Sequence, residues 1–563
     1  MKLTGAQIII ETLIDHGVEV IFGYPGAAVI HLYDELLRQD KIKHILVRHE
    51  QAAIHAAEGY ARATGKVGVA VVTSGPGATN TVTGIADALM DSTPIVCITG
   101  QVARALIGQS AFQEADVTGI TRSISKYNSI VYEPDELAYK LQEAFYISKS
   151  GRPGPVVIDI PMDIQAQEIS YEKKPYQKRA SYRMPSTIDD TSLSQAAALI
   201  QQAKRPVIYG GGGLIHSGAA DVFRAFAKKT GFPDTLTLMG LGAYPASDPQ
   251  FLGMLGMHGS YQANKAMHGS DLIIAVGARF DNRVTAALEK FAPDAAVIHI
   301  DIDETSIDKT VWADVGIVGD AAQVLTALNQ KITHVADISA WNAQIEAWKS
   351  VDCFKIENET ADMIKPQSVI KKLSAMTAGK DVGILTDVGQ HQMFTANYFK
   401  FEKPRQFITS GGFGTMGYGM PATIGANLAI PDKTFVCISG DGSFLMNVQE
   451  LATAAVYNIP IKVIIINNGY LGMVKQVQDV CFGSRYSQVS LDKAPDFVKI
   501  AHAFGCDGAR IETYTQLEAG LAQMLASDKP FILDIKTSAD EACLPMIKFG
   551  GGHDDMILQQ KGK

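Results

Sequence analysis

The sequence predicts an α/β protein with three doubly wound domains, each built on a parallel sheet that helices cover on both faces. Three observations predict it: apolar runs alternate with helix-like segments, two polar segments divide the chain into thirds, and two of the thirds share short motifs. Continuous apolar runs are typical of strands buried in a parallel sheet. The expected strands are 18–22, 67–73, 94–100, 155–161, 272–278, 296–302, 461–468 and 531–536.

The domain boundaries follow from the two polar, proline-bearing segments, which lie at 167–186 and 350–368. A chain of 563 residues is also too long for a single hydrophobic core. We therefore expect three domains and a C-terminal tail, at 1–170, 186–350, 365–540 and 541–563.

The N-terminal segment is expected to form the first helix, with Thr4 as its N-cap and Gly17 at its end. It carries acidic residues, whereas a secretory signal has a basic start and an unbroken apolar stretch. No apolar run approaches the roughly 20 residues that a membrane-spanning helix needs. A net charge of −9 gives no basic footprint for nucleic acid, and the six cysteines contain no CxxC pair. We expect a cytoplasmic protein with reduced thiols that binds neither nucleic acid nor membranes.

The first and third blocks contain similar motifs in the same order. "TSGPG" from Thr73 precedes "VCITG" ending at Gly100, and "TSGGFG" from Thr409 precedes "VCISG" ending at Gly440. Short glycine-rich matches arise by chance, but two matches at comparable separation favour a duplicated domain.

The strongest chemical signal is an aspartate between two glycines, directly after the apolar run that ends at Gly440. Asn468 follows Asp441 by 27 positions (468 − 441), the length of one helix and one strand, so both should emerge at one edge of a parallel sheet. Carboxylate and amide oxygens suit Mg²⁺ or Ca²⁺ bound to a diphosphate. Gly442 lets the backbone approach phosphate, and Ser443 begins a helix. An isolated "GDG" is more often a tight turn with a capping aspartate, and the paired asparagines reverse that preference.

The combination of GDG, an intervening stretch of this length and NN resembles the thiamine-diphosphate enzymes. The resemblance implies the fold of those enzymes, with Mg²⁺ held by Asp441, Asn468 and the carbonyl of Tyr470. Further motifs, "DVGQHQM" and "GFGTMGYGMPATIGA", match the same family. By that resemblance the thiamine diphosphate contacts are Gly26, Pro76, Asn80, Val388, Gly389, Gln390, His391, Met416, Gly440, Gly442, Ser443 and Met473.

The family also needs a glutamate that exchanges a proton with the thiamine pyrimidine ring, supplied by the first domain. Glu50, in "LVRHEQAAIHAAEGYARATGK", lies at a strand end before a helix, and Glu58 further along that helix competes with it. A first-turn glutamate can also serve only to complement the helix dipole. The family pattern selects Glu50 as the proton-transfer group.

Several longer motifs resemble one branch of the family, the catalytic subunits of acetohydroxyacid synthase, also called acetolactate synthase. They cover nearly the whole chain and include "QSAFQEADVTGITRSISKYN", "GARFDNRVT", "NNGYLGMVKQ" and "PMIKFGGGHDDMI". The resemblance implies decarboxylation of pyruvate and transfer of the two-carbon unit to a second 2-keto acid, giving 2-acetolactate and CO₂. Gln113 and Phe112 would then flank the reacting groups, while Arg283 and Val477 would lie near the second substrate.

The same branch binds FAD in the central domain without using it for net oxidation or reduction. A glycine run after a strand, "YGGGG", is weak evidence for a dinucleotide when taken alone. By the resemblance, the FAD contacts are Gly211, Gly212, Met257, His258, Gly277, Arg279, Asp281 and Asp301.

Two departures from the family pattern leave specificity open. Val477 stands where biosynthetic members carry a tryptophan that favours 2-ketobutyrate, and Met162 replaces a lysine common near the substrate entrance. Pyruvate oxidase and decarboxylase are the alternative enzymes; a glyoxylate carboligase would lack Glu50, and a non-catalytic scaffold would have lost Glu50, Asp441 or Asn468. The resemblance implies at least a homodimer, with Glu50 of one chain facing Asp441 of another. A tetramer, a small regulatory subunit and the physiological role, branched-chain amino-acid synthesis or pyruvate disposal, are left open.

Overall fold

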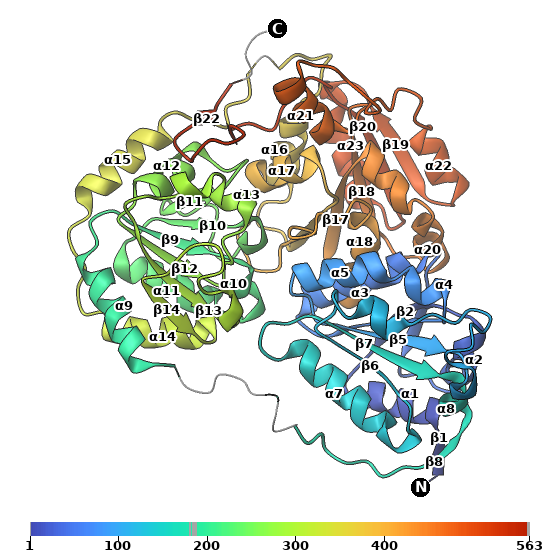
Figure 1. Ribbon diagram of the computed structural model, residues 1–563. Coiled ribbons are helices and arrows are strands. Elements are labelled where there is room, and N and C mark those ends of the chain that lie inside the picture. The colour runs from blue at the N-terminus through green and yellow to red at the C-terminus, as the bar shows by residue number, and fades with distance from the viewer. Residues whose placement is uncertain (1, 179–181, 183–187, 358, 560–563) are drawn as a thin grey trace.

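The computed structural model describes residues 2–178, 182, 188–357 and 359–559, and these form three domains around three six-stranded sheets. The central domain lies to one side of the molecule, and the N- and C-terminal domains stack against each other on the other side (Figure 1). The sheets fall within 20–161, 206–318 and 382–536, each inside one of the expected domains. No helix among the described residues is long and apolar enough to cross a membrane.

The N-terminal domain is a parallel sheet with the strand order β3-β2-β4-β5-β7-β6. Its strands are β2 (Val20–Tyr24), β3 (Lys43–Leu46), β4 (Gly68–Val72), β5 (Ile95–Gln101), β6 (Tyr127–Ile130) and β7 (Pro155–Pro161). Its helices are α1 (Gly5–Asp15), α2 (Ile30–Leu36), α3 (Glu50–Thr64), α4 (Pro76–Thr79), α5 (Val82–Met90), α6 (Val117–Thr121), α7 (Leu137–Lys149) and α8 (Met162–Ala166). The short strands β1 (Lys2–Thr4) and β8 (Glu168–Ser170) pair antiparallel beside it.

The central domain has the strand order β11-β10-β9-β12-β13-β14, which differs from that of the N-terminal domain. Its strands are β9 (Pro206–Gly210), β10 (Asp234–Leu236), β11 (Phe251–Met254), β12 (Leu272–Val276), β13 (Ala296–Asp301) and β14 (Val315–Val318). Its helices are α9 (Asp190–Gln202), α10 (Gly212–His216), α11 (Ala220–Thr230), α12 (Tyr261–Gly269), α13 (Asn282–Thr285), α14 (Ala321–Lys331) and α15 (Ser339–Lys349).

The C-terminal domain has the strand order β16-β15-β17-β18-β20-β19. Its strands are β15 (Val382–Thr386), β16 (Phe407–Thr409), β17 (Thr434–Gly440), β18 (Lys462–Asn467), β19 (Asp507–Ile511) and β20 (Phe531–Lys536). Its helices are α16 (Pro366–Met376), α17 (Gln390–Tyr398), α18 (Gly419–Ala429), α19 (Asp441–Phe444), α20 (Glu450–Val456), α21 (Gly472–Phe482), α22 (Phe497–Ala503) and α23 (Tyr514–Ala526). The tail ends in a hairpin of β21 (Met546–Ile547) and β22 (Met556–Ile557).

The structure agrees with the strands and the first helix that the sequence predicted. Each predicted apolar run overlaps a strand, and the predicted α/β class is confirmed. Thr4 caps α1 through a capping box, and Gly17 follows the helix with φ of 70°, a conformation that glycine adopts at little cost. Part of the predicted boundary at 167–186 lies outside the described residues.

The duplication of the first and third domains is visible in their topology, but the motifs that suggested it were paired wrongly. Numbered within each domain, both sheets have the order 2-1-3-4-6-5. "TSGPG" follows the third strand of the N-terminal domain, whereas "TSGGFG" starts at the end of the second strand of the C-terminal domain. The two segments are therefore not equivalent, and their likeness reflects only that both are glycine-rich turns at a strand end.

The helices that follow the second strands, α3 and α18, are the equivalent pair, and they pack against each other. A Cβ atom at Gly59 would lie 2.0 Å from the Ala422 carbonyl oxygen, and one at Gly425 would lie 1.8 Å from that of Ala56. Ala56 and Gly59 of α3 are separated from Ala422 and Gly425 of α18 by the same number of positions (422 − 56 = 425 − 59), so the two reciprocal contacts are related by a pseudo-twofold axis. Glycine is required at both positions because any side chain would overlap the facing backbone.

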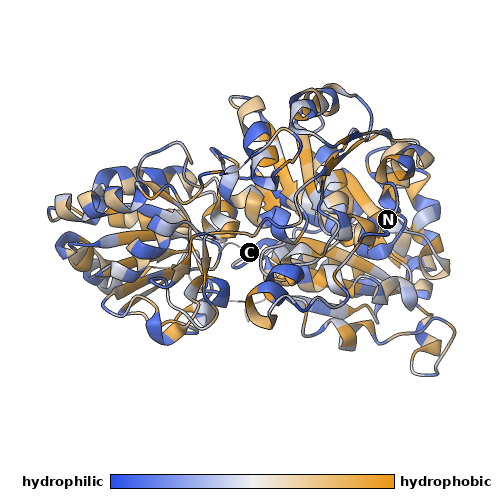
Figure 2. Ribbon diagram, turned by 90° about the horizontal axis from the view of Figure 1, so that it is seen from above, coloured by the Kyte–Doolittle hydropathy of each residue, from blue (hydrophilic) through white to orange (hydrophobic). Residues whose placement is uncertain are grey.

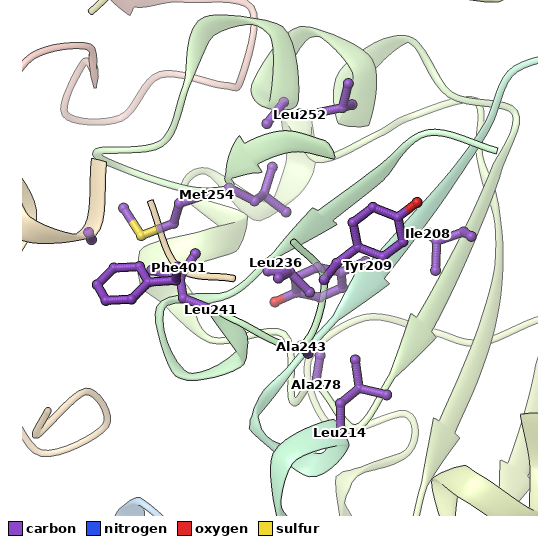
Figure 3. Close-up of a cluster of buried hydrophobic side chains, with 14 of the residues drawn as sticks. Ile208, Tyr209, Leu214, Leu236, Leu241, Ala243, Leu252, Met254, Ala278 and Phe401 are labelled. Carbon is purple, nitrogen blue, oxygen red and sulfur yellow. The ribbon is translucent and has the colours of Figure 1, made fainter. Parts of the chain in front are cut away.

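Apolar residues concentrate on the strands, and polar residues on the outer helices, as Figure 2 shows for all three domains. Figure 3 shows part of the core of the central domain, where Tyr209 and Leu236 come from adjacent strands of one sheet. Phe401, from the C-terminal domain, belongs to the same buried cluster and lies beside Leu241 (Figure 3). The core of the central domain therefore continues into the C-terminal domain.

Candidate active site

The predicted cofactor residues lie where the strand order of each sheet reverses. These reversals fall between β2 and β4, between β9 and β12, and between β15 and β17. In open α/β sheets, ligands bind at the carboxyl ends of the two strands that flank such a reversal. Gly26 follows β2, Gly211 follows β9 and Gly389 follows β15. Each of the three sheets therefore presents an edge at which a ligand could bind.

In the C-terminal domain, one small cavity collects every predicted diphosphate and metal residue of that domain. It opens at the edge formed by β15, β17 and β18. The predicted residues that line it are Val388, Gly389, Gln390, His391, Met416, Gly440, Asp441, Gly442, Ser443, Asn468, Tyr470 and Met473.

Asp441 is 2% exposed and follows directly after β17. Its Oδ2 accepts a hydrogen bond of 2.7 Å from the backbone nitrogen of Gly469, and its Oδ1 accepts one of 3.0 Å from that of Gly442. Burial raises the pKa of this carboxyl to about 6, although these hydrogen bonds act in the opposite direction. A buried carboxylate with a raised pKa is stabilised by a cation, so the donor set fits Mg²⁺.

Asn468 completes the oxygen set from the neighbouring strand, β18. Its Oδ1 accepts a hydrogen bond of 3.0 Å from the backbone nitrogen of Tyr470, and its Nδ2 lies 3.3 Å from Gln390 Oε1. Gln390 is itself held by the Gln476 side chain at 2.9 Å. The amide oxygen of Asn468 therefore points away from Gln390 and toward the turn that carries the Tyr470 carbonyl.

His391 also lines the small cavity. Burial lowers the pKa of this imidazole to about 3, so it is neutral, and its Nε2 atom is buried without a hydrogen-bond partner. A Cβ atom at Gly440 would lie 2.9 Å from His391 Nδ1, so glycine is needed there for the ring to fit. An unpartnered buried nitrogen is costly, and a bound phosphate or sugar-like group would satisfy it.

Asp387 is a site residue that sequence reasoning missed. It is 1% exposed, and its Oδ1 accepts hydrogen bonds from the backbone nitrogens of Val388 at 2.9 Å and Gly417 at 2.8 Å. One carboxylate therefore fixes both loops that carry Val388 and Met416. The available signal was its place as the first polar residue after a buried strand, at the start of "DVGQHQM".

In the N-terminal domain, the predicted residues gather around the turn after β4. Asn80 Nδ2 donates to Glu50 Oε2 at 2.9 Å, and a Cβ atom at Gly77 would lie 3.4 Å from Glu50 Oε1. The backbone of Gln113 comes within 3.0 Å of the position of a Cβ at Gly75, and Gly26 packs against Thr73. Pro76 begins α4 in the same turn. Phe112 is 88% exposed and lies beside Gln113 in the chain.

Glu58, the competitor of Glu50, lies in a different environment. It is fully buried between the N- and C-terminal domains, and its Oε1 is 3.0 Å from His55 Nδ1. Burial raises its pKa well above the ordinary value, and the nearby Asp91 carboxylate adds to the effect. His55, Glu58 and Asp87 place three possible ligand atoms within 4.8 Å of one another. Glu50 is the accessible acid at the edge of the sheet, and Glu58 belongs to the domain interface.

The two groups of thiamine-diphosphate residues do not share a cavity within one chain. Glu50, Asn80 and Gln113 do not line the small cavity. They do not line a second, larger cavity between the three domains either. The acid and the diphosphate edge thus belong to separate domains, and they share neither of these two cavities.

A large cavity of about 1200 Å³ lies between the three domains and contains every predicted FAD residue. It runs along the reversal between β9 and β12, where a Cβ at Gly211 would lie 2.2 Å from the Gly277 carbonyl oxygen. The predicted residues that line it are Gly211, Gly212, Met257, His258, Gly277, Arg279, Asp281 and Asp301. Its size and its position at the reversal fit a dinucleotide.

Polar groups in the large cavity remain to be satisfied by a ligand. The buried Tyr209 hydroxyl has no hydrogen-bond partner, and burial raises the pKa of Asp301 to about 6. Arg279 pairs with Asp281 at 2.6 Å, next to the glycine turn. Arg152, from the N-terminal domain, enters the same cavity and approaches Asp303 at 3.4 Å.

The predicted substrate residues of the central and C-terminal domains lie at the end of this cavity that approaches the small one. Arg283 and Val477 both line it, and Val388, Gly389 and Met473 are shared by the two cavities. Arg283 Nη1 contacts Met257 Sδ at 3.6 Å. Phe112 and Gln113 are not among the lining residues.

Three family models match the chain. They are the N-terminal thiamine pyrophosphate binding domain at residues 3–120, the central domain of thiamine pyrophosphate enzymes at 193–328, and the C-terminal thiamine pyrophosphate binding domain at 387–535. Each range falls within one of the three domains, although the first ends before β6 and β7 and the third begins after β15.

Curated relatives align over almost the full chain. The acetolactate synthase isozyme 3 large subunit of Escherichia coli is 47% identical over 569 residues, covering 99% of each chain. The acetolactate synthase large subunit of Haemophilus influenzae is 46% identical over 567 residues, also covering 99% of each chain. That of Corynebacterium glutamicum is 44% identical over 564 residues, covering 99% of this chain and 90% of the relative.

Proposed function

The chain belongs to the acetolactate synthase large subunits within the thiamine pyrophosphate enzymes, and from this premise we propose that it condenses two molecules of pyruvate to 2-acetolactate and CO₂. The observation that carries the proposal is the small cavity around Asp441, whose oxygen donors match a magnesium diphosphate. When bound, thiamine diphosphate supplies an electron sink for decarboxylation.

The residues of this chain bind and orient the reacting groups. Asp441, Asn468 and the Tyr470 carbonyl would hold Mg²⁺, and His391 and Ser443 would meet the cofactor beside it. Glu50 would exchange a proton through Oε1, because Asn80 already engages its Oε2. Arg283, an exposed guanidinium at the cavity mouth, would bind the carboxylate of the second keto acid.

We propose that the active site is completed between two chains. The acid edge with Glu50 and the diphosphate edge with Asp441 belong to separate domains and line no common cavity among those described, so a homodimer that pairs them across chains would bring both to one cofactor. Complementation tests this: Glu50→Gln and Asp441→Asn chains, each with little activity at limiting cofactor, should regain activity when refolded together, because mixed dimers contain one intact site. Absence of recovery despite proven mixed dimers would refute it.

FAD is proposed for the large cavity, where the Tyr209 hydroxyl is unpartnered, the buried Asp301 carboxyl lines the wall and the glycines after β9 and β12 leave room for a diphosphate. The relatives are named large subunits, so we further propose that this chain also binds a small subunit.

Product analysis tests the activity. Purified protein incubated with pyruvate, Mg²⁺ and thiamine diphosphate should release 2-acetolactate, while acetyl phosphate or free acetaldehyde in its place would indicate an oxidase or a decarboxylase.

A competition assay tests the second substrate. Val477 is a half-buried, small lining residue, so Val477→Trp should favour 2-ketobutyrate over pyruvate by about tenfold, the scale of one or two methylene contacts in a pocket. An unchanged product ratio with both substrates present would show that residue 477 does not set the preference.

A further inference from the structure

The loop between β5 and α6, residues 102–116, carries Phe112 and Gln113 and is anchored by a buried side chain at its start. Gln101, the last residue of β5, donates from Nε2 to the Ala115 carbonyl oxygen at 2.8 Å. Its Oε1 accepts from the backbone nitrogen of Val102 at 2.9 Å. One amide therefore holds both ends of the loop, and it can do so only in one orientation.

Asp159, on the neighbouring strand β7, determines that orientation. Its Oδ2 accepts the second Nε2 hydrogen of Gln101 at 2.9 Å, and its Oδ1 accepts from the Thr99 hydroxyl at 2.6 Å. Turning the Gln101 amide over would place its oxygen against both the Asp159 carboxylate and the Ala115 carbonyl. The side chain of Asp159 is 1% exposed, so water does not substitute for these bonds.

The anchored end of the loop determines where Gln113 lies. Gln113 stands two residues before Ala115 and has φ of 59°, a left-handed conformation that is strained for this residue type. Its backbone packs on Gly75, which also has positive φ, in the turn that leads to Asn80 and Glu50. Such strain persists only where the surrounding contacts hold the loop in place.

We propose that Asp159 is a positioning residue, which acts through Gln101 and the Ala115 carbonyl to hold Gln113 against the Gly75 turn in the catalytically competent loop conformation. The inference rests on the proposed function, because it takes Gln113 and Phe112 to flank the substrates. Asp159 itself touches neither substrate nor cofactor.

A positioning role that depends on the protonation state of Asp159 can be distinguished from simple packing, because it changes with pH. Burial raises its pKa to about 7. The titratable groups that face it are the buried Cys97 thiol on β5 and Asp116 at the end of the loop, and the negative charge of Asp116 acts in the same direction as burial. A carboxylate binds the Gln101 amide more strongly than the neutral acid does, so the loop is held more firmly above pH 7 than below it.

Asp159→Asn fixes the residue in its uncharged form while keeping its shape. We expect the kcat/KM of this variant at pH 8 to be about five- to tenfold lower than that of the wild type, the difference between a charged and a neutral hydrogen bond. We also expect the variant to lack the fall in kcat/KM that the wild type shows below about pH 7. Wild-type activity at pH 8, or an unchanged acid limb, would overturn the proposal if the loop also keeps its wild-type protection from hydrogen exchange.

Gln101→Glu is the complementary variant, because it places a carboxylate against Asp159. The pair can share a proton at low pH and repels at high pH, so activity should fall as pH rises, opposite to the wild type. A pH-independent loss would mean that residue 101 acts only through its packing, and would overturn the proposal.

Asp163→Asn is the matched control, since Asp163 holds the same loop through Arg104 at 2.7 Å. Partial burial acts to raise the pKa of Asp163, but hydrogen bonds from Arg104 outweigh it and keep the pKa below the ordinary value. Its loss should therefore reduce activity equally across pH 6 to 9.

Hydrogen exchange of the holoenzyme separates this inference from the proposed function. Amides in 102–116, corrected for intrinsic rates, should be less protected in Asp159→Asn than in the wild type at pH 8. Reduced protection with unchanged kinetics would support the positioning and refute the role of Gln113 in the reaction. Equal protection would overturn the positioning itself.

Discussion

The N- and C-terminal domains have one topology, and the proposed function gives them different chemical roles. Both sheets have the order 2-1-3-4-6-5. Helices α3 and α18 are related by a pseudo-twofold axis and contact each other at Gly59 and Gly425. After the third strand, the C-terminal domain places Asp441 at the sheet edge, whereas the N-terminal domain places the turn around Gly75 there. After the second strand, the N-terminal domain places Glu50, and the C-terminal domain has the segment from Ser410.

A duplicated sheet supplies two edges whose loops can change in sequence independently of each other. They can do so because loops at strand ends contribute few residues to the hydrophobic core. In the proposed function, one edge would hold a metal and a diphosphate, and the other would present an acid. Substitutions in the two halves should therefore change different measured quantities.

The largest effect is expected in the N-terminal half. Glu50→Gln should lower kcat by about 10² or more, because it removes a proton-transfer group, while thiamine diphosphate binding and the unfolding transition stay close to wild type. Stopped-assay turnover together with calorimetric titration of the cofactor checks both parts. Near-normal turnover would show that Glu50 is not the acid.

The counterpart in the C-terminal half is Asp441→Asn. Because this carboxyl is buried among metal-binding oxygens, its loss should weaken Mg²⁺ and thiamine diphosphate affinity by about 10- to 100-fold, with activity partly restored by excess cofactor. Cofactor titration of activity and of bound ligand measures this. A loss of kcat at saturating cofactor with unchanged affinity would reverse the roles assigned to the two halves.

The contact between the halves should be sensitive to a single methyl group. Gly425→Ala and Gly59→Ala each force a Cβ into facing backbone and should reduce the free energy of unfolding by about 1–3 kcal/mol. Denaturant unfolding at a fixed protein concentration measures it. Gly269→Ala is the matched helical control, since its nearest neighbour lies at 3.4 Å; an equal loss there would point to a general effect of the substitution.

The last effect concerns the acid inside that contact and appears only in the pH dependence of stability. Glu58 has a pKa raised by burial, so the folded chain keeps a proton that the unfolded chain loses above its ordinary pKa of 4.5. Its contribution to stability is fully present below that pH and is lost as pH rises toward the folded pKa. Glu58→Gln cannot titrate, so its stability should fall less steeply with pH, by up to about 1.4 kcal/mol per pH unit. Identical slopes in chemical denaturation between pH 5 and 8 would contradict this.

Much of the fold and of the diphosphate site could be predicted because the relevant signals are local. A continuous apolar run is the signature of a buried parallel strand, and the interval from Asp441 to Asn468 equals one helix and one strand, which places both at one edge of the sheet. The other predicted residues that line the small cavity were expected from the resemblance to the thiamine-diphosphate enzymes.

Other residues escaped prediction because their partners lie far away in the chain. Asp387 holds Gly417, Asp159 holds Gln101, and Glu58 faces the C-terminal domain, and each reads in sequence as an ordinary acid near a strand or in a helix. The pairing of "TSGPG" with "TSGGFG" failed for a related reason: a turn motif does not record which strand of the sheet precedes it.

There is a physical reason why some features could be predicted from the sequence and others required the tertiary structure. Strand and helix periodicity, turn chemistry and the spacing of metal-binding oxygens depend on neighbours in the chain, so the amino-acid order was sufficient for the three sheets and for the edge that carries Asp441. Burial, carboxyl pKa values and the separation of Glu50 from Asp441 depend on contacts between segments hundreds of residues apart, such as Gly59 with Ala422, and those contacts exist only once the domains have packed.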